Sequence, residues 1–240
     1  MADAVTLLVS DLHLSVDRPD TSAAFIALLA GPARDAAALF ILGDLFDYWI
    51  GDDDLDAPAV QPVVDALAAL SASGTKVSFM HGNRDFLVGD RFAAATGVQL
   101  LPDPLRLDLD GVPTLLMHGD TLCTGDTAYN GFRAMVRAPE WQRDFLARPL
   151  ADRRAEARRL RLLSEQEKAA KTADIMDVTP AEVLRVLREN GYPRLVHGHT
   201  HRPARHVHPV DGRACERWVL PDWQASATGL VAAGGHLQRF

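Results

Sequence analysis

The sequence predicts an α/β protein built around a parallel sheet. Short apolar runs rich in large and β-branched residues recur along the chain, and segments with helical spacing separate the first three runs. The 240 residues are 48% hydrophobic and 24% charged, which is typical of a soluble globular domain that buries a core without disulfides or structural metal. We therefore expect residues 1–240 to form a single domain.

Five apolar runs predict buried strands. They cover residues 5–9, 38–42, 76–80, 113–117 and 194–196. Residues 21–29 and 60–72 have the spacing of helices, and such alternation of strand and helix favours a parallel sheet. From residue 205 onward the sequence indicates antiparallel strands, with turns at Asp211-Gly212 and Gly234-Gly235.

The segment between Arg133 and Lys171 interrupts this alternation with Arg, Glu, Ala and Leu at helical spacing. It carries eleven Lys or Arg against six Asp or Glu, although the whole chain has a net charge of −7. We expect a helical cap insertion, at about residues 125–175, that covers a crevice in the α/β body. A further helix is predicted to begin at Pro180, with Thr179 as its capping residue.

Composition and charge exclude several classes of function. The acidic balance produces no field that would concentrate nucleic acid, so we expect no nucleic-acid partner. The two cysteines, Cys123 and Cys215, are too few for a disulfide framework and indicate ordinary thiols of a reducing compartment. The first residues do not resemble a signal sequence, and no stretch approaches the roughly 18 apolar residues of a spanning helix. These features predict a cytoplasmic protein.

A polar motif follows each of the five predicted strands. The motifs are Ser10-Asp11-Leu12-His13, Gly43-Asp44-Leu45-Phe46-Asp47, His81-Gly82-Asn83-Arg84-Asp85, His118-Gly119-Asp120 and His197-Gly198-His199-Thr200-His201. Ligands bind outside the carboxyl ends of strands in open α/β sheets, so these motifs can converge there. Asp11 and His13 can share one cation, and the two oxygens of Asp44 can bridge two. Mixed carboxylate and imidazole ligands favour Mn²⁺, Fe²⁺ or Zn²⁺ over Ca²⁺.

These spaced motifs resemble the signature of the calcineurin-like metallophosphoesterases, from residue 11 to residue 201. The resemblance implies a four-layer α/β/β/α sandwich and two divalent metal ions. One ion would be held by Asp11, His13, Asp44 and His201, and the other by Asp44, Asn83, His118 and His199. We expect Asp47, Asp85 and Asp120 to support these ligands rather than bind metal, and Cys123 to be structural.

Arg84 departs from the general pattern of this superfamily, in which many members have a histidine that protonates the leaving group. Arginine stays charged and donates in a fixed fork, so it can hold phosphate oxygens but is a poor general acid. A phosphate leaving group needs no such proton. The substitution therefore favours cleavage of a P–O–P bond over phosphomonoester hydrolysis.

Four longer motifs are similar to the UDP-2,3-diacylglucosamine hydrolase family of lipid A biosynthesis. They lie at residues 47–52, 81–86, 174–178 and 197–203. The similarity implies hydrolysis of the pyrophosphate bond of UDP-2,3-diacylglucosamine, by metal-activated water attack at the α-phosphorus and most commonly with Mn²⁺. The products would be UMP and 2,3-diacylglucosamine 1-phosphate, known as lipid X.

The same similarity implies residues that contact the substrate. Asn83 and Arg84 would act on the phosphates as catalytic groups, with His199 beside them. Asp126, Ser164, Lys168 and Lys171 would contact the nucleotide and the glucosamine phosphate, and helical spacing places Arg161 on the same face. A solvated basic helix is the alternative interpretation of this face.

Apolar residues in and near the insertion predict either an acyl-chain groove or an ordinary helix core. They are Trp49, Trp141, Phe145, Leu146, Leu160, Leu162 and Leu163. A basic, leucine-bearing surface also favours peripheral association of a monomer with the cytoplasmic face of the inner membrane. Two alternatives stay open: a nucleotide pyrophosphatase or phosphodiesterase with a soluble substrate, and a noncatalytic scaffold, against which the complete ligand set argues.

Overall fold

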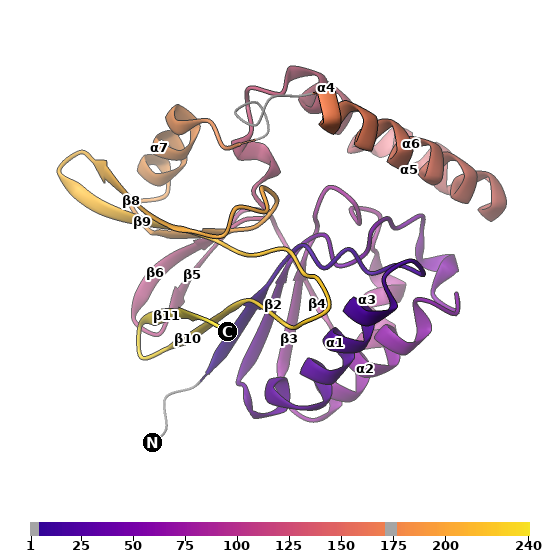
Figure 1. Ribbon diagram of the computed structural model, residues 1–240, viewed down its shortest axis with the longest axis horizontal. Coiled ribbons are helices and arrows are strands. Elements are labelled where there is room, and N and C mark those ends of the chain that lie inside the picture. Colours follow the sequence, from indigo (N-terminus) through magenta and orange to yellow (C-terminus); the bar gives the residue numbers. More distant parts are fainter. Residues whose placement is uncertain (1–4, 171–176) are drawn as a thin grey trace.

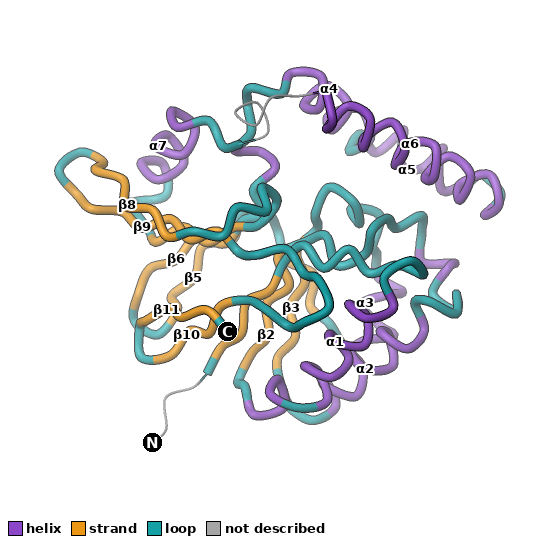
Figure 2. Tube along the Cα trace, in the orientation of Figure 1, coloured by secondary structure: helices purple, strands orange, loops and turns teal. Residues whose placement is uncertain are grey.

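The computed structural model describes residues 5–170 and 177–240, but not the side chains of residue 165 and residues 167–170. Two β-sheets stack face to face in the middle of the molecule, and helices cover their outer faces (Figure 1). Figure 2 shows the same arrangement as two groups of strands with helices on both outer sides.

The first sheet has the strand order β11-β10-β1-β2-β3-β4. Strands β1 (Thr6–Val9), β2 (Ala38–Leu42), β3 (Lys76–Met80) and β4 (Gln99–Leu101) are parallel, and β10 (Leu230–Ala233) and β11 (His236–Arg239) extend the sheet antiparallel. Helices α1 (Pro19–Ala30), α2 (Gln61–Ala72) and α3 (Asp90–Thr96) connect the parallel strands, with short 3₁₀ turns at η1 (Pro32–Asp35) and η2 (Asp52–Asp54). The predicted alternation of strand and helix is confirmed.

The second sheet has the order β5-β6-β7-β9-β8. Its strands are β5 (Leu105–Leu109), β6 (Val112–Leu116), β7 (Arg194–His197), β8 (Arg205–Val210) and β9 (Arg213–Val219), of which β6, β7 and β9 are parallel. The predicted hairpins are present, because Asp211 and Gly212 join β8 to β9 and Gly234 and Gly235 join β10 to β11. The parallel pairing of β9 with β7 was not foreseen.

Three separate cores make the molecule a four-layer sandwich. Leu8, Leu42 and Leu116 belong to the core between the two sheets. Helices α1–α3 cover the other face of the first sheet over a core that includes Phe25. Helix α7 (Pro180–Glu189) covers the second sheet, because Val183, Val186 and Leu187 recur at helical spacing and are buried. The predicted α/β/β/α architecture is confirmed.

Helix α7 begins at the predicted residue but not with the predicted cap. Thr179 directly precedes the helix, yet its hydroxyl makes no capping bond. It accepts a hydrogen bond of 2.8 Å from the Thr124 hydroxyl instead. The sequence predicted the helix start correctly, but the side chain expected to cap the helix forms a tertiary hydrogen bond instead.

Helices α4 (Thr127–Val136), α5 (Pro139–Leu146) and α6 (Leu150–Ala170) form an arm that follows the 3₁₀ turn η3 (Asp120–Leu122) and projects beyond the sandwich (Figure 1). Arg153 of α6 is 2% exposed and donates hydrogen bonds to the Asp53 carboxylate and the Ile50 carbonyl. Arg154 pairs with Asp54 beside it. These contacts fix the start of α6 to the 3₁₀ turn η2.

None of the described helices combines the length and apolar character needed to cross a bilayer.

Candidate active site

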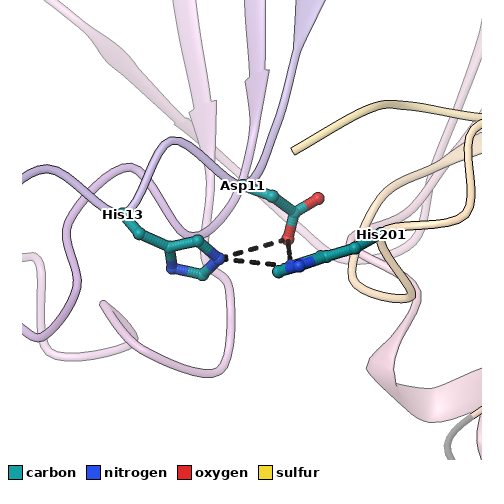
Figure 3. Close-up of side chains that lie close together, drawn as sticks. All are labelled: Asp11, His13 and His201. Atoms are coloured by element: carbon teal, nitrogen blue, oxygen red, sulfur yellow. Dashed lines mark hydrogen bonds and ion pairs between the residues drawn. The ribbon is translucent and has the colours of Figure 1, made fainter. Parts of the chain in front are cut away.

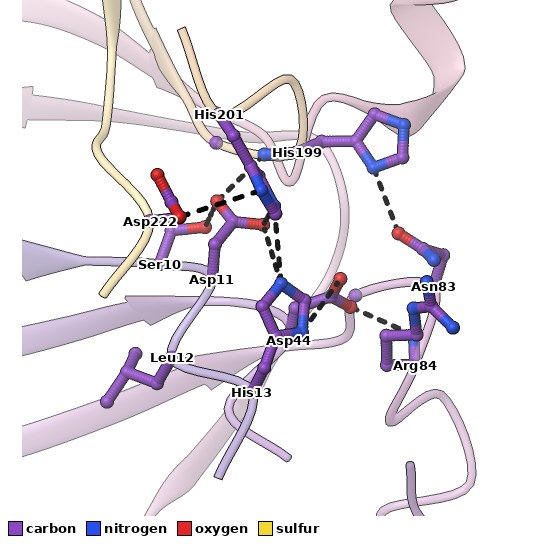
Figure 4. Close-up of polar contacts among 12 residues, drawn as sticks. Ser10, Asp11, Leu12, His13, Asp44, Asn83, Arg84, His199, His201 and Asp222 are labelled. Atoms are coloured by element: carbon purple, nitrogen blue, oxygen red, sulfur yellow. Dashed lines mark hydrogen bonds and ion pairs between the residues drawn. The ribbon is translucent and has the colours of Figure 1, made fainter. Parts of the chain in front are cut away.

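Loops at the carboxyl ends of five strands place the predicted metal ligands in one cluster. Asp11 and His13 follow β1, Asp44 follows β2, Asn83 follows β3, His118 follows β6, and His199 and His201 follow β7. Segments almost 190 residues apart are adjacent here, because the His199 backbone N–H donates to Asp11 Oδ2 over 2.8 Å (Figure 4). The two sheets therefore both contribute to the cluster.

Asp11, His13 and His201 form one group of possible ligands, with their ligand atoms within 4.8 Å of one another (Figure 3). Nε2 of His201 lies 3.4 Å from Asp11 Oδ1 and 3.2 Å from Nε2 of His13. Asp11 Oδ2 accepts a hydrogen bond of 2.6 Å from Ser10, whereas the buried Oδ1 accepts none from the described residues. An unsatisfied buried carboxylate oxygen that faces two imidazole nitrogens fits a bound cation.

Asp44 lies between this group and a second one. Its Oδ2 is 3.9 Å from Nδ1 of His13, and its Oδ1 is 3.7 Å from Nε2 of His118. Asn83 Oδ1 completes the second group, 3.0 Å from Nε2 of His118 and 2.9 Å from Nδ1 of His199. The Asp44 carboxylate thus directs one oxygen toward each group, which is the arrangement that a two-metal centre requires.

The orientation of His118 suits a metal ligand. Its Nδ1 donates a hydrogen bond of 2.9 Å to the Leu42 carbonyl, which leaves Nε2, the nitrogen that faces Asp44 and Asn83, to bind a metal ion once it has lost its proton. Carboxylate oxygens, an amide oxygen and imidazole nitrogens in this cluster form a donor set that fits divalent transition metals.

The backbone of the cluster is strained. Asp11, His13, Asp44, His199 and His201 all have φ between 50° and 66°, and they are five of the eight described non-glycine residues with positive φ. Each such conformation costs on the order of 1–3 kcal/mol and persists only where surrounding contacts impose it. The Asp11 N–H donates to the Gly43 carbonyl and the His13 N–H donates to the Asp44 carbonyl. Such a concentration of strain marks a functional site.

Two glycines of the motifs are required by close approach of the loops. A Cβ at Gly198 would lie 2.2 Å from Asp11 Oδ2, and a Cβ at Gly82 would lie 2.1 Å from Asp44 Oδ1. Any side chain at either position would therefore displace a carboxylate of the cluster. This explains why glycine precedes the polar residues in these motifs.

The titratable groups of the cluster are strongly perturbed. Burial alone would lower the pKa of His118, but the carboxylates of Asp44, Asp120 and Asp11 raise it to about 9. Burial would raise the pKa of Asp11, yet His201 and the other histidines hold it well below its ordinary value. Several carboxylates thus create a negative potential in a buried space, which a bound cation would offset.

Arg84 lies between the cluster and the arm. Its backbone N–H donates a hydrogen bond of 2.8 Å to Asp44 Oδ1, and its guanidinium NH2 lies 3.5 Å from the Ser164 hydroxyl of α6. The residue therefore connects the metal-ligand loops to the arm. Figure 4 shows Asn83 and Arg84 next to each other at this side of the cluster.

A groove of about 290 Å³ runs between the sandwich and the arm. Its polar lining includes Asp47, Asn83, Arg84, Arg161 and Ser164. Its apolar lining includes the predicted residues Trp49, Trp141, Phe145, Leu160 and Leu163, together with Tyr48, Phe86, Phe132 and Val136, which the sequence did not indicate. Leu146 and Leu162 do not line it. The lining of the groove thus combines polar and charged side chains beside the cluster with apolar side chains from both the arm and the sandwich.

The chain matches the calcineurin-like phosphoesterase family over residues 4–203. It belongs to that family. A UDP-2,3-diacylglucosamine hydrolase of Aromatoleum aromaticum is 56% identical over 93% of this chain and 91% of its own. Proteins of the same name from Chromohalobacter salexigens and Pseudomonas aeruginosa are 52% and 48% identical, and each alignment covers at least 89% of both chains.

Family membership accounts for the dimetal arrangement, but several predicted substrate contacts have other partners in the structure. The Asp126 carboxylate accepts a hydrogen bond from the Tyr129 N–H and caps α4. Arg161 donates to Asp47 over 2.9 Å, which places Asp47 in the groove rather than against the ligands. The Lys168 side chain and Lys171 lie outside the described part of the chain, as do residues 174–176 of the motif at residues 174–178.

The two other carboxylates predicted to support the ligands are Asp85 and Asp120. Asp85 accepts hydrogen bonds from the backbone of the ligand loops, and Asp120 accepts them from side chains of the arm. Asp85 accepts hydrogen bonds from the backbone N–H groups of Gly82 and Leu45. Asp120 accepts hydrogen bonds of 2.8 Å from the Tyr129 hydroxyl and 2.6 Å from Arg133, both on α4. Cys123 is buried, which raises its thiol pKa to about 12.

Sequence reasoning missed Asp222 and Arg18. Asp222 Oδ2 lies 3.9 Å from Nδ1 of His201, close enough to attract a protonated ring but too far for a hydrogen bond. It follows β9, so the strand-end rule applied to Leu220-Pro221-Asp222 could have found it. Arg18 donates to the carbonyls of Leu12 and Trp223 and joins the two loops behind Asp11. No sequence pattern indicated that contact.

Proposed function

We propose that this phosphoesterase hydrolyses the pyrophosphate bond of UDP-2,3-diacylglucosamine, with water attacking the α-phosphorus, to give UMP and 2,3-diacylglucosamine 1-phosphate (lipid X). The groove carries this proposal, because its lining includes Asn83 and Arg84 beside the cluster together with apolar side chains of the arm and the sandwich. A substrate with a pyrophosphate at one end and acyl chains at the other matches that distribution of polarity. The names of the most similar relatives support the same substrate.

We further propose two Mn²⁺ ions as the cofactor. Asp11, His13, Asp44 and His201 would hold one, and Asp44, Asn83, His118 and His199 the other. When bound, such ions lower the pKa of water and neutralise charge on the phosphoryl oxygens. The unsatisfied Asp11 oxygen and the two-sided position of Asp44 support this assignment.

Arg84 determines which bond can be cleaved. Its guanidinium can hold two phosphate oxygens and stabilise the charge that develops as the P–O–P bond breaks. It cannot supply a proton, and a phosphate leaving group does not need one. Asn83 beside it orients the phosphoryl group through its amide.

The arm serves as the cap of the active site in this proposal, as an insertion at about residues 125–175. The arm exposes Met135 on α4 and Leu162 on α6, and α6 also exposes Arg158 and Arg159. Apolar side chains next to cations favour peripheral binding to anionic lipid. We therefore propose a monomer that works at the cytoplasmic face of the inner membrane, where its lipid substrate would enter the groove.

The decisive experiment measures UMP release by Mn²⁺-loaded protein from UDP-2,3-diacylglucosamine and, in parallel, from UDP-N-acetylglucosamine. Release from the acylated substrate alone supports both the reaction and the role of the groove. Activity on soluble nucleotides without activity on the lipid would retain a phosphoesterase site but refute the proposed substrate. Stoichiometric Mn²⁺ without hydrolysis of either compound would indicate a binding scaffold.

A further inference from the structure

A second cavity, of about 300 Å³, lies on the other side of the loop that carries His199 and His201. It is formed on the face of the second sheet that also carries the core under α7. His206 of β8 and Arg217 of β9 are directly opposite each other in the strand register, and both line it. Thr200, Arg202 and Asp177 complete its polar lining. None of these residues lines the groove at Arg84.

Arg217 is the unusual residue of this cavity. It is 6% exposed, and its Nε and NH1 donate hydrogen bonds to Nε2 of His208 at 3.2 Å and Nε2 of His197 at 3.1 Å. His197 in turn donates from Nδ1 to the Gly198 carbonyl over 2.9 Å. A ring that donates from one nitrogen and accepts at the other is neutral. The buried guanidinium is therefore held by neutral acceptors.

No ion pair among the described residues includes Arg217. The nearest carboxylate of the cavity belongs to Asp177, which is an ion-pair partner of Arg202 and accepts the Val178 N–H over 2.7 Å. Buried charges in proteins are ordinarily paired with an opposite charge, because burial removes their hydration. Asp177, the one carboxylate among the lining residues, thus attracts Arg217 but forms its ion pair with Arg202, so Arg217 has no ion pair of its own among the described residues.

Thr200 supplies a second unsatisfied group. Its hydroxyl is buried, lines the cavity and has no hydrogen-bond partner among the described residues. A hydroxyl can donate to an anion, as can the guanidinium of Arg217. A donor and a cation around an empty volume form a site for a negatively charged ligand.

We propose that this cavity binds a phosphate group, as inorganic phosphate or as a phosphate monoester, between Arg217 and Thr200. The planar guanidinium fits two oxygens of a tetrahedral anion, and the hydroxyl reaches a third. This phosphate site is separate from the proposed hydrolytic site, so the proposal of phosphate binding and the proposal of hydrolysis can each be refuted independently.

Isothermal titration of Mn²⁺-loaded, desalted protein with inorganic phosphate tests the site. Wild-type protein is expected to bind one more phosphate per chain than Arg217→Gln, since Gln keeps hydrogen-bonding capacity but removes the charge. Arg213→Gln is the matched control, because Arg213 is on the same strand but lies over the Tyr192 ring. Equal stoichiometry and affinity in wild type and Arg217→Gln would overturn the proposal.

A second variant and a crystallographic experiment keep the proposal testable if Arg217→Gln misfolds. Thr200→Val keeps the shape of the side chain and is expected to weaken phosphate binding at this site about tenfold. Crystals of the Mn²⁺-loaded protein soaked with tungstate should show tungsten between Arg217 and Thr200. Tungsten at the metal cluster alone would refute the site.

Parallel titration with a nucleoside monophosphate distinguishes the two sources of the phosphate group. Tighter binding of inorganic phosphate identifies the free ion as the ligand, tighter binding of the nucleotide identifies a monoester, and equal affinities show that the site holds the phosphate group of either compound. If wild type and Arg217→Gln give the same binding heat with phosphate and with the nucleotide, the proposal is contradicted.

Discussion

The carboxylate of Asp85 accepts a hydrogen bond of 2.7 Å from the backbone N–H of Leu45 and thereby joins the loop after β3 to the loop after β2. The same carboxylate accepts the Gly82 N–H over 2.8 Å and longer bonds from Asp44 and Phe46. Asp85 is fully buried. One side chain therefore holds the backbone that positions both Asp44 and Asn83.

We expect Asp85→Ala to lower the free energy of unfolding by about 2–4 kcal/mol, because several buried N–H groups lose their acceptor. Urea unfolding of the metal-free protein measures this. Asp85→Asn keeps one acceptor oxygen and should be less destabilised. Asp65→Ala, at an exposed position on α2, is the control and should behave as wild type. A neutral effect of Asp85→Ala would contradict the role assigned to the carboxylate.

Replacement of Asp44 by Ala should remove both bound metal and turnover, because its two oxygens face the two ligand groups. Metal affinity and turnover should each fall by more than the ~10–100-fold that is typical when a hydrogen-bond partner of a metal ligand is removed. Metal content by atomic emission and UMP release are measured on the same preparation. A variant that kept stoichiometric metal and full turnover would show that Asp44 is not a shared ligand.

Replacement of Arg84 by Ala should lower kcat by about 10²–10³-fold, as removal of a single preorganised donor does elsewhere. Metal content should stay the same, since the bond from residue 84 to Asp44 comes from the backbone N–H. Arg84→Lys should recover only part of the rate, because lysine lacks the planar fork. Equal losses of metal and rate would instead indicate a ligand or folding role.

Replacement of Arg153 by Ala should release the start of α6 from the 3₁₀ turn η2, because Arg153 bonds Asp53, Ile50 and Arg148. We expect proteolysis within the arm to accelerate about tenfold, which corresponds to roughly 1.4 kcal/mol of local stability. Limited trypsin digestion followed by mass spectrometry measures the rate, and metal content should not change. Arg159→Ala, at an exposed position on the same helix, is the control. Cleavage confined to other segments would disprove this anchoring role.

Asp103 makes stability depend on pH. Burial and the neighbouring Asp120 raise its pKa to about 6 from an ordinary 3.8. The folded state therefore holds this proton more tightly than the unfolded state, so ionisation of Asp103 destabilises the fold progressively as the pH rises from 3.8 to about 6.

Asp103→Asn should consequently raise the free energy of unfolding at about pH 8, by up to about 3 kcal/mol, and give little gain near pH 4. Chemical unfolding in the presence of a chelator at both pH values measures the difference. A gain of equal size at the two pH values would show that charge at Asp103 is not the cause.

The sequence predicted strands, connecting helices and polar motifs because their signals are local, whereas the four layers were implied only by the family resemblance. Apolar runs alternate with helical segments along the chain, and each run ends in a polar motif, so the strands and the cluster at their carboxyl ends could both be inferred. The pairing of β9 with β7, and hence the placement of Asp222 beside His201, depends on contacts between distant segments that no local pattern encodes.

Helical periodicity determined which residues of the arm share a face, but only the tertiary structure decided which face meets the sandwich. Leu160 and Leu163 line the groove, whereas Leu162 is 66% exposed on the same helix. Long-range contacts of this helix include that of Arg153, whose partner Asp53 lies 100 residues earlier in the chain. The sequence by itself determined the chemistry of the ligand set, since residue types fix donors and charges. Packing determined the shape of the groove, because orientation follows from long-range contacts.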